Sequence, residues 1–244
     1  TDVSGSITGT PASITLPTGY SIITGSSDSY IVGPGVDLTG ADLIGADLTG
    51  IDLTNANLTD VTSGSVTGAP TMPTGYVIIN NYIVGPNVDL TGADLSAADL
   101  GGVDLTGADL TGADLADVTS GSVTGAPTLP TDYSLVNGYI VGPNLDLTGA
   151  DLTGGDLAGV DLTGTDLTGV LGSVAGVPTL PAEYSIINNY IVGPNVDLTG
   201  ADLTDADLNG INLTGVTLTG AVLTGVASGS VTGAPTLPTD YSLV

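Results

Sequence analysis

The segment from Val88 to Val118 reads VDLTG ADLSA ADLGG VDLTG ADLTG ADLAD V and repeats every five residues. Each unit has a leucine at its third position and a small or β-branched apolar residue two positions earlier. This spacing matches neither a helix, with a period of about 3.6 residues, nor a strand, with a period of about two. A short extended step followed by a Thr-Gly corner satisfies it. Repeated corners of one hand predict a coil with Leu and Ala inside and Asp, Thr and Gly outside.

The unit Ala-Asp-Leu-Thr-Gly resembles the repeat of the pentapeptide-repeat proteins, in which Ala is followed by Asp or Asn, then Leu or Phe, then two variable residues. The resemblance implies an all-β fold, a right-handed, four-sided β-solenoid with Leu and Ala filling its interior. We predict one continuous repeat array over residues 1–244. Function varies widely across this family, so the resemblance indicates a fold and not an activity. The repeat blocks are residues 36–61, 88–118, 145–170 and 196–226, and the connectors are residues 1–35, 62–87, 119–144, 171–195 and 227–244.

The connectors resemble, more loosely, those of secreted bacterial repeat proteins that carry Leu-Pro-x-x-Tyr and Tyr-Ile-Val-Gly-Pro. Pro34, Pro86, Pro143 and Pro194 lie 52, 57 and 51 residues apart, because the blocks alternate between five and six units. If a coil holds about 20 residues, a difference of five residues shifts the next connector by one side. The connectors span 26 or 27 residues and so break the phase, which predicts a bulge or loop at Gly-Ala-Pro-Thr-Leu-Pro.

Each connector also contains two β-prone runs separated by a turn-like pair of residues. Tyr-Ile-Val follows Asn-Asn at 80–81 and 188–189 and Asn-Gly at 137–138, and an apolar run precedes each pair. This pattern predicts either a small hairpin or two solenoid sides that meet at a corner. The first connector has four extra residues around 25–29, which predict a polar loop tip.

The composition excludes several classes of function. The 244 residues contain no Lys, Arg, His or Cys, and the formal net charge is −26. Without a cation, a phosphate clamp, a Schiff-base lysine, a histidine base and arginine contacts to nucleic acid are excluded. Without cysteine, thiol catalysis, thiolate metal sites and disulfides are excluded, and the redox compartment stays open. A chain without Lys and Arg also resists trypsin-like proteases, which suits a long life outside cells.

The sequence shows neither a membrane-spanning segment nor a leader. No uninterrupted apolar run of about 18 residues occurs, so we predict no membrane insertion. The chain begins with Thr1 and does not open with a succession of charged, apolar and small regions. We therefore expect a mature product or an excerpt of a longer protein.

The aspartate before each leucine is expected to point outward. Stacked coils lie about 4.8 Å apart, so these carboxylates would form ladders. The ladders could bind divalent cations such as calcium or mimic the charge of DNA, as some pentapeptide-repeat proteins do toward a topoisomerase. We favour a structural interpretation, in which the carboxylates accept backbone N–H bonds at the corners and salt screens the rest. Neither an EF-hand loop nor the glycine-rich calcium repeat is present, so we predict no cofactor and no metal site, with calcium as the open alternative. The aspartates are Asp42, Asp47, Asp52, Asp94, Asp99, Asp104, Asp109, Asp114, Asp151, Asp156, Asp161 and Asp166.

Threonine after the leucine forms a second outward row. Flat threonine arrays bind ice and dense threonine carries O-linked sugars, but threonine is also a good polar residue at a β-corner, which is the interpretation we favour. The sequons Asn57-Leu58-Thr59 and Asn212-Leu213-Thr214 lie inside the repeat, so we expect them to be incidental. The threonines are Thr39, Thr49, Thr54, Thr91, Thr106, Thr111, Thr148, Thr153, Thr163 and Thr168.

Two further residue types deserve an interpretation. The nine tyrosines could form ligand platforms, but we expect them to cover the coil as amphipathic side chains at connector junctions. Glu183 is the only glutamate and the aspartates are equivalent, so nothing separates a general acid from a base. We predict no enzyme and no catalytic residue. The tyrosines are Tyr20, Tyr30, Tyr76, Tyr82, Tyr133, Tyr139, Tyr184, Tyr190 and Tyr241.

The ends of the chain bear on function. The chain starts within one connector at Thr1 and stops within another at Val244, with no polar cap at either end. Uncapped solenoids expose strand edges, so we expect the coil to continue in a longer polypeptide or by head-to-tail stacking into an open filament. Asn212, Thr217 and Val222 replace the outward aspartate and lower repulsion where a neighbour would dock.

The sequence therefore predicts an extracellular or cell-surface structural protein, a β-solenoid that builds a fibre, matrix or stalk by self-assembly. The alternative is an acidic binding module, either a calcium- or glycan-dependent adhesin or a DNA-mimicking pentapeptide-repeat protein. Glycosylation on threonine fits either hypothesis.

Overall fold

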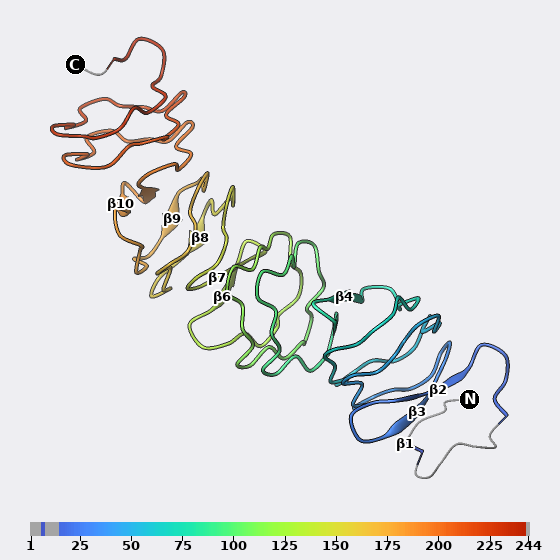
Figure 1. Cartoon of the computed structure of the whole chain (residues 1–244). Helices are drawn as coiled ribbons and strands as arrows, with labels where there is room; N and C mark the ends of the chain where they lie inside the picture. The colour runs from blue at the N-terminus through green and yellow to red at the C-terminus, as the bar shows by residue number, and fades with distance from the viewer. Residues whose placement is uncertain (1–5, 8–14, 243–244) are drawn as a thin grey trace. The chain divides into compact units, whose positions relative to one another are not determined.

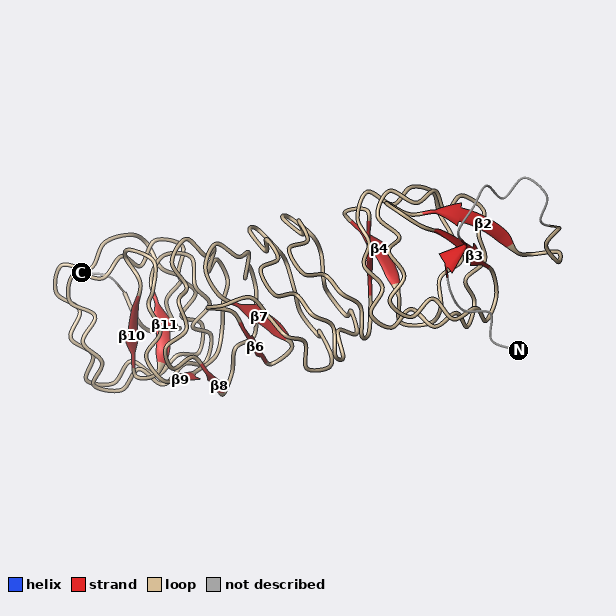
Figure 2. Cartoon of the chain, turned by 90° about the horizontal axis from the view of Figure 1, so that it is seen from below, coloured by secondary structure: helices blue, strands red, loops and turns tan. Residues whose placement is uncertain are grey.

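The computed structural model describes residues 6–7 and 15–242, and most of this chain is corner and loop rather than regular strand (Figure 2). No helix occurs among these residues, and so none that is long and apolar enough to cross a membrane. The short strands are β1 (Ser6–Ile7), β2 (Ser21–Thr24), β3 (Ser29–Val32), β4 (Val77–Ile79), β5 (Tyr82–Val84), β6 (Ser134–Val136), β7 (Tyr139–Val141), β8 (Gly155–Asp156), β9 (Val174–Ala175), β10 (Ser185–Ile187) and β11 (Tyr190–Val192).

The chain divides into two compact units, which are described separately. Unit 1 contains residues 1–115 and 123–131, and unit 2 contains residues 116–122 and 132–244. In each unit the backbone winds through stacked coils, and in Figure 1 neighbouring coils have similar colours because they follow one another along the chain. The prediction of one uninterrupted array over residues 1–244 concerns the relation between the units and stays a prediction.

One five-residue unit forms one side of a coil. In the first block the N–H of Ala41 donates to the carbonyl oxygen of Leu38 at 2.8 Å, which closes a turn around Thr39 and Gly40. The third residue of such a turn needs a positive φ, and Gly40 has a φ of 67°. Asp37 pairs in parallel with Asn57, twenty residues later, so four units return the chain to the same side. The repeat thus produces a four-sided β-solenoid, as predicted.

The side chains divide between inside and outside as the period predicts. Leucines of the repeat, apart from the partly buried Leu223, are buried completely or almost completely, and most of the small residues two positions earlier lie beside them in the core. The core is a narrow column of aliphatic side chains in each unit, and the aspartates and threonines face outward. Fully buried examples are Leu43, Leu48, Leu53 and Leu58 in unit 1, and Leu152, Leu157, Leu162 and Leu167 in unit 2.

Each of the first four connectors forms a hairpin, which decides between the two alternatives left open by the sequence. β4 pairs antiparallel with β5 around Asn80 and Asn81, whose φ angles are 48° and 65°. β6 pairs with β7, and β10 pairs with β11, in the same register. In the first connector β3 pairs with both β2 and β1, and residues 25–28 form the expected loop tip. The rest of that connector, residues 1–5 and 8–14, lies outside the described residues.

The hairpin and the Gly-Ala-Pro corner together account for the break in phase. Asp52 pairs with Thr71, nineteen residues later, so the corner before Thr71 is one residue short. Thr62 pairs with Asp89, twenty-seven residues later, because the hairpin stands between them. The sequence predicted a bulge or loop at Gly-Ala-Pro-Thr-Leu-Pro, but the corner there is one residue short, as the pairing of Asp109 with Thr128 also shows. The hairpin makes the larger contribution to the break in phase.

The length of a block sets the side on which the next hairpin lies. In unit 1 the hydroxyl of Tyr30, on β3, accepts the N–H of Asp42, and Asp42, Thr62 and Asp89 are paired on one side of successive coils. The hydroxyl of Tyr82, on β5, accepts the N–H of Asp94, which lies one side further along. The five-unit block between these hairpins therefore moves the second by one side. The effect of a six-unit block stays a prediction.

Truncation of one core leucine tests this inside and outside assignment. Leu48 is fully buried, so Leu48→Ala leaves a cavity and is expected to lower the free energy of unfolding by about 2–5 kcal/mol. Ile44, which is 44% exposed in the same block, provides the control, and Ile44→Ala should have little effect. Denaturant unfolding followed by circular dichroism measures both. Equal effects of the two variants would contradict the assignment.

Candidate functional site

The outward aspartates have a structural task at the corners of the coil. The Oδ1 atom of Asp47 accepts the N–H of Thr49 at 2.9 Å, two residues later, and the aspartates of the other regular units do the same. This contact satisfies an N–H that the turn leaves unpaired, as in an Asx-turn. It confirms the prediction that the carboxylates accept backbone N–H bonds at the corners. The acceptors are Asp37, Asp42, Asp47, Asp52, Asp89, Asp94, Asp99, Asp104, Asp109, Asp146, Asp151, Asp156, Asp161, Asp166, Asp197, Asp202 and Asp207.

The threonine after the leucine often adds a second bond to the same oxygen. The hydroxyl of Thr106 donates to Oδ1 of Asp104 at 2.6 Å, beside the N–H of Thr106. These bonds favour the ionised carboxylate and hold its pKa below the ordinary value, with the hydroxyl making the larger contribution. The aspartates whose pKa is lowered in this way, with serine in place of threonine at Asp94, are Asp37, Asp47, Asp52, Asp94, Asp104, Asp109, Asp151, Asp161 and Asp202.

Asparagine can replace aspartate at this corner. Thr59 and Thr214 donate their N–H groups to the amide oxygens of Asn57 and Asn212, at 3.2 and 3.0 Å. The amide of Asn57 also donates to the hydroxyl of Thr39 on the neighbouring coil at 2.9 Å. Both sequon asparagines therefore take part in the fold. The corner requires an oxygen acceptor and does not require a negative charge.

The acidic rows do not gather into a metal site in the described part of the chain. No group of three or more carboxylates there is arranged to hold a metal ion. One oxygen of each repeat carboxylate is already bonded at its own corner. The alternative of calcium binding therefore has no preformed site among residues 6–7 and 15–242.

The first tyrosine of each of the first four connectors forms a corner with glycine and proline. The hydroxyl of Tyr76 donates to the carbonyl oxygen of Pro86 at 2.9 Å, and the ring lies against Gly85, where an added Cβ would stand 2.4 Å from Cδ1 of Tyr76. Burial, and then the charge of Asp104, raises the pKa of Tyr76. Tyr20, Tyr133 and Tyr184 make the same hydrogen bond to Pro34, Pro143 and Pro194. These tyrosines cover connector junctions, as predicted.

The hairpin tips are fastened to the coil that follows them. The side-chain amide of Asn80 donates to the carbonyl oxygen of Ser96 at 2.9 Å, sixteen residues later. Asn137 and Asn188 reach Thr153 and Thr204 in the same way. The sequence indicated only a turn at these asparagines, because nothing local shows that their side chains contact the next coil.

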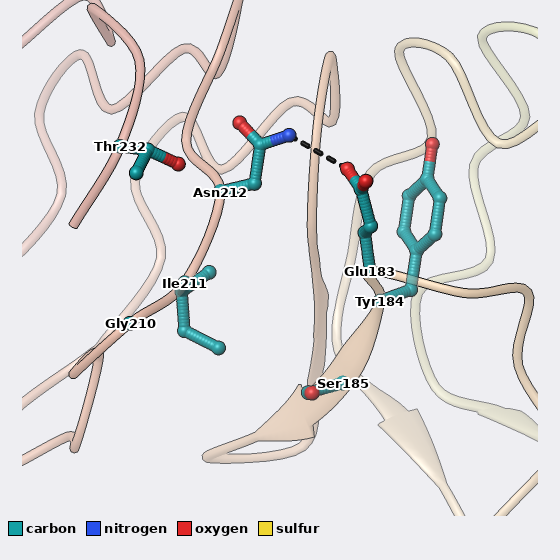
Figure 3. Close-up of a pocket in the computed structure, with 7 residues that line it drawn as sticks. All are labelled: Glu183, Tyr184, Ser185, Gly210, Ile211, Asn212 and Thr232. Carbon is teal, nitrogen blue, oxygen red and sulfur yellow. Dashed lines mark hydrogen bonds between the residues drawn. The ribbon is translucent and has the colours of Figure 1, made fainter. Parts of the chain in front are cut away.

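A groove of about 390 Å³ in unit 2 contains the only glutamate (Figure 3). Glu183 has a φ of 74°, and its Oε2 accepts the amide N–H of Asn212 at 2.7 Å. Asn212 stands where the repeat usually has aspartate, so the exchange removes a repulsion between two carboxylates and supplies a donor. Ser185 and Thr232 line the same groove. The carboxylate is occupied in joining the connector to the coil. The other titratable side chain of the groove is Tyr184, whose pKa is raised by burial and then by the charges of Asp166 and Glu183.

Sequence comparison agrees with this geometry. The family model for pentapeptide repeats matches eight copies, over residues 34–61, 87–119, 143–170 and 195–227, which is half of the chain. The chain belongs to the pentapeptide-repeat family. The matched ranges coincide with the four predicted blocks to within two residues.

Solved structures of other pentapeptide-repeat proteins are also similar to this one. HetL, involved in heterocyst differentiation regulation in the cyanobacterium Nostoc sp., is 24% identical, with 81% of this chain and 87% of HetL covered and a TM-score of 0.21. QnrB1, a plasmid-mediated fluoroquinolone resistance protein, is 15% identical, with 85% and 80% covered and a TM-score of 0.14. The comparison with curated proteins gives no match. The family membership establishes the fold and leaves the function to be argued from the residues.

The bonded aspartates make the stability of this pentapeptide-repeat protein sensitive to acid. Their folded pKa values lie below the ordinary value of 3.8, so their contribution to stability is complete above that value and is lost as the pH falls through the folded values. We expect the melting temperature to fall steadily below about pH 4. Thermal unfolding at a series of pH values measures this. A melting temperature that rises on acidification would show that relief of charge repulsion outweighs the corner bonds.

A pair of substitutions separates the acceptor from its charge. Asp47→Asn keeps an oxygen for the N–H of Thr49, as Asn57 does for Thr59, and should leave stability at neutral pH nearly unchanged. Asp47→Ala removes the acceptor and should destabilise the coil. If the asparagine variant were as unstable as the alanine variant, the charge itself would be required.

Substitution of Gly85 tests whether the ring of Tyr76 is the reason for glycine at this position. Gly85→Ala places a Cβ against the ring of Tyr76 and should cost about 3 kcal/mol of unfolding free energy. Gly92 is the control, because an added Cβ there meets nothing within 4 Å and only its positive φ is unfavourable, at about 1 kcal/mol. Ala97 already occupies the same kind of corner, with a φ of 55°. Denaturant unfolding measures both variants, and equal costs would remove the ring contact as the reason for glycine.

Proposed function

We propose that this pentapeptide-repeat protein is an extracellular structural protein whose coils extend into a fibre, and that it catalyses no reaction. One observation supports this most strongly. The contact between successive coils is the same parallel bridge wherever the repeat is regular, as in Asp89 with Asp109 in unit 1 and Asp197 with Thr217 in unit 2.

This contact can be continued by translation along the coil axis. Each coil donates N–H groups and offers carbonyl oxygens toward the next one, as when Leu90 donates to Asp109 and Asp109 donates to Val88. The two edges of a coil are therefore complementary to each other. A contact of this kind between unlike surfaces does not close into a ring and yields an open filament when it recurs. The partner best suited to a coil edge is another coil of the same kind.

The charge of the surface favours growth along the axis over lateral association. Every ionisable side chain of the repeat blocks is an acid, and no Lys or Arg offers a lateral ion pair. Neighbouring fibres would repel one another over about 8–10 Å at physiological salt. The absence of Lys and Arg also removes the cleavage sites of trypsin-like proteases, which supports a place outside the cell or on its surface.

Electron microscopy and sedimentation of the purified chain test the proposal. We expect filaments that form with rising protein concentration, in chelator as well as in calcium, with an axial spacing of about 4.8 Å. Val222→Asp provides a matched variant, because Val222 is 46% exposed at a position where the repeat usually has aspartate. It should keep the fold and weaken assembly through added repulsion.

Discrete monomers or dimers at every concentration would contradict the proposal. If the same sample then gained thermal stability from calcium or bound a glycan, the acidic binding module would become the better account. Filaments that form only with calcium would also favour that account, since they would depend on a ligand and not on coil stacking alone.

A further inference from the structure

The described chain contains two Asn-Gly pairs in very different surroundings. They are Asn137-Gly138, at the tip of the β6–β7 hairpin, and Asn209-Gly210, in the fourth block. Asn-Gly is chemically labile because the glycine nitrogen has no neighbouring side chain to hinder its approach to the asparagine amide carbon. The fold decides which pair can react.

In Asn209-Gly210, the glycine N–H and both polar atoms of the asparagine side chain are hydrogen-bonded. The N–H of Gly210 donates to the carbonyl oxygen of Gly229 on the next coil at 2.9 Å. Oδ1 of Asn209 accepts the N–H of Gly229 at 2.5 Å, and Nδ2 donates to Oδ1 of Asp207 at 2.6 Å. The glycine nitrogen is thus directed away from the asparagine side chain and into the wall of the coil.

Asn137-Gly138 lacks this protection. Asn137 is exposed at the hairpin tip, with a φ of 52°, and Gly138 has a φ of 79°. Within the part of the chain that the structure describes, the N–H of Gly138 has no hydrogen-bond partner. The one restraint on Asn137 is its side-chain amide, which donates to the carbonyl oxygen of Thr153 at 2.9 Å. Asn80 and Asn188 hold the same position in their hairpins but are followed by asparagine, whose side chain hinders the attack.

We infer that Asn137 is a site of spontaneous, age-dependent deamidation. The nitrogen of Gly138 forms a bond to Cγ of Asn137, the Cγ–Nδ2 bond breaks, and ammonia leaves with the proton of the glycine N–H. Water then opens the cyclic imide at one of its two carbonyl carbons, giving aspartate or isoaspartate. No oxidant, reductant or enzyme is needed.

The modification removes the fastening between this hairpin and the next coil. The amide that donates to Thr153 becomes a carboxylate that faces the same carbonyl oxygen, so an attraction becomes a repulsion. The isoaspartate product also lengthens the backbone by one carbon within a two-residue turn, which breaks the register of β6 with β7. Ageing would thus loosen one hairpin while leaving β4–β5 and β10–β11 docked.

Peptide mapping of the aged full chain tests the inference. The protein is incubated at mildly alkaline pH in heavy-oxygen water, digested with pepsin because trypsin has no cleavage site, and analysed by mass spectrometry. We expect Asn137 to convert at least about tenfold faster than Asn209, since the protected site holds two further hydrogen bonds that oppose the reaction. Conversion of Asn209 at an equal or higher rate, or no conversion at Asn137, would overturn the inference.

Two variants connect the chemistry to the hairpin. Gly138→Asn reproduces the pair found at 188–189 and should suppress conversion of Asn137 without unfolding the turn. Asn137→Asp mimics one product and should speed hydrogen exchange in residues 134–141, whereas the hairpin of residues 185–192 should exchange as in the unaltered protein. If hydrogen exchange in Asn137→Asp were unchanged, the hydrogen bond from the side-chain amide of Asn137 to Thr153 would not be what holds the hairpin against the coil.

Discussion

The corner of the five-residue unit is the constraint on which the rest of this structure depends. At each corner two short hydrogen bonds act together, one from the small residue to the leucine carbonyl and one from the threonine N–H to the aspartate oxygen. They turn the chain by one side and leave the leucine pointing inward. Four such corners bring Asp37 beside Asn57, and the interior then fills with aliphatic side chains. Burial of those side chains supplies the stability, but the corners decide where they go.

The hairpins show how a second level of structure follows from counting units. A five-unit block contains one side more than a full coil, so the next hairpin lies one side further along. Unit 2 repeats what unit 1 shows: Asn137 is fastened at Thr153 and Asn188 at Thr204, on adjacent sides of the coil. The second, third and fourth hairpins are each fixed by contacts that their own repeat carries, the tyrosine corner at the base and the asparagine at the tip. The position of a hairpin is therefore encoded in block length, and its docking is encoded in the connector.

The period predicted the fold, the core and the outward aspartates, because each of these depends on contacts within one unit or between identical units. The connector was harder. Asn-Asn before Tyr-Ile-Val fits a hairpin or a corner equally well, and the choice depends on Tyr82 reaching the N–H of Asp94 and Asn80 reaching Ser96. The contact of Glu183 with Asn212 spans 29 residues. The sequence shows only that the chain has one glutamate and that asparagine replaces aspartate at position 212, and nothing in it connects the two facts. Side-chain contacts between unlike segments have no period to reveal them.

The same corner also explains how a chain with a net charge of −26 and no cation keeps a compact coil. Some carboxylates face another carboxylate on the next coil, as Asp89 faces Asp109, but many face a neutral residue, as Asp42 faces Thr62. Each bonded carboxylate also completes a turn that would otherwise leave an N–H unpaired. Hydrogen bonds of this kind favour the ionised form, as the lowered pKa of Asp104 and Asp151 indicates. The negative charge of the surface thus follows in part from the use of aspartate as the hydrogen-bond acceptor at the corners. The acidic surface is therefore weaker evidence for a cationic ligand here than it would be on a globular protein. Asn57 and Asn212 show that an uncharged side-chain oxygen can accept the same N–H bond.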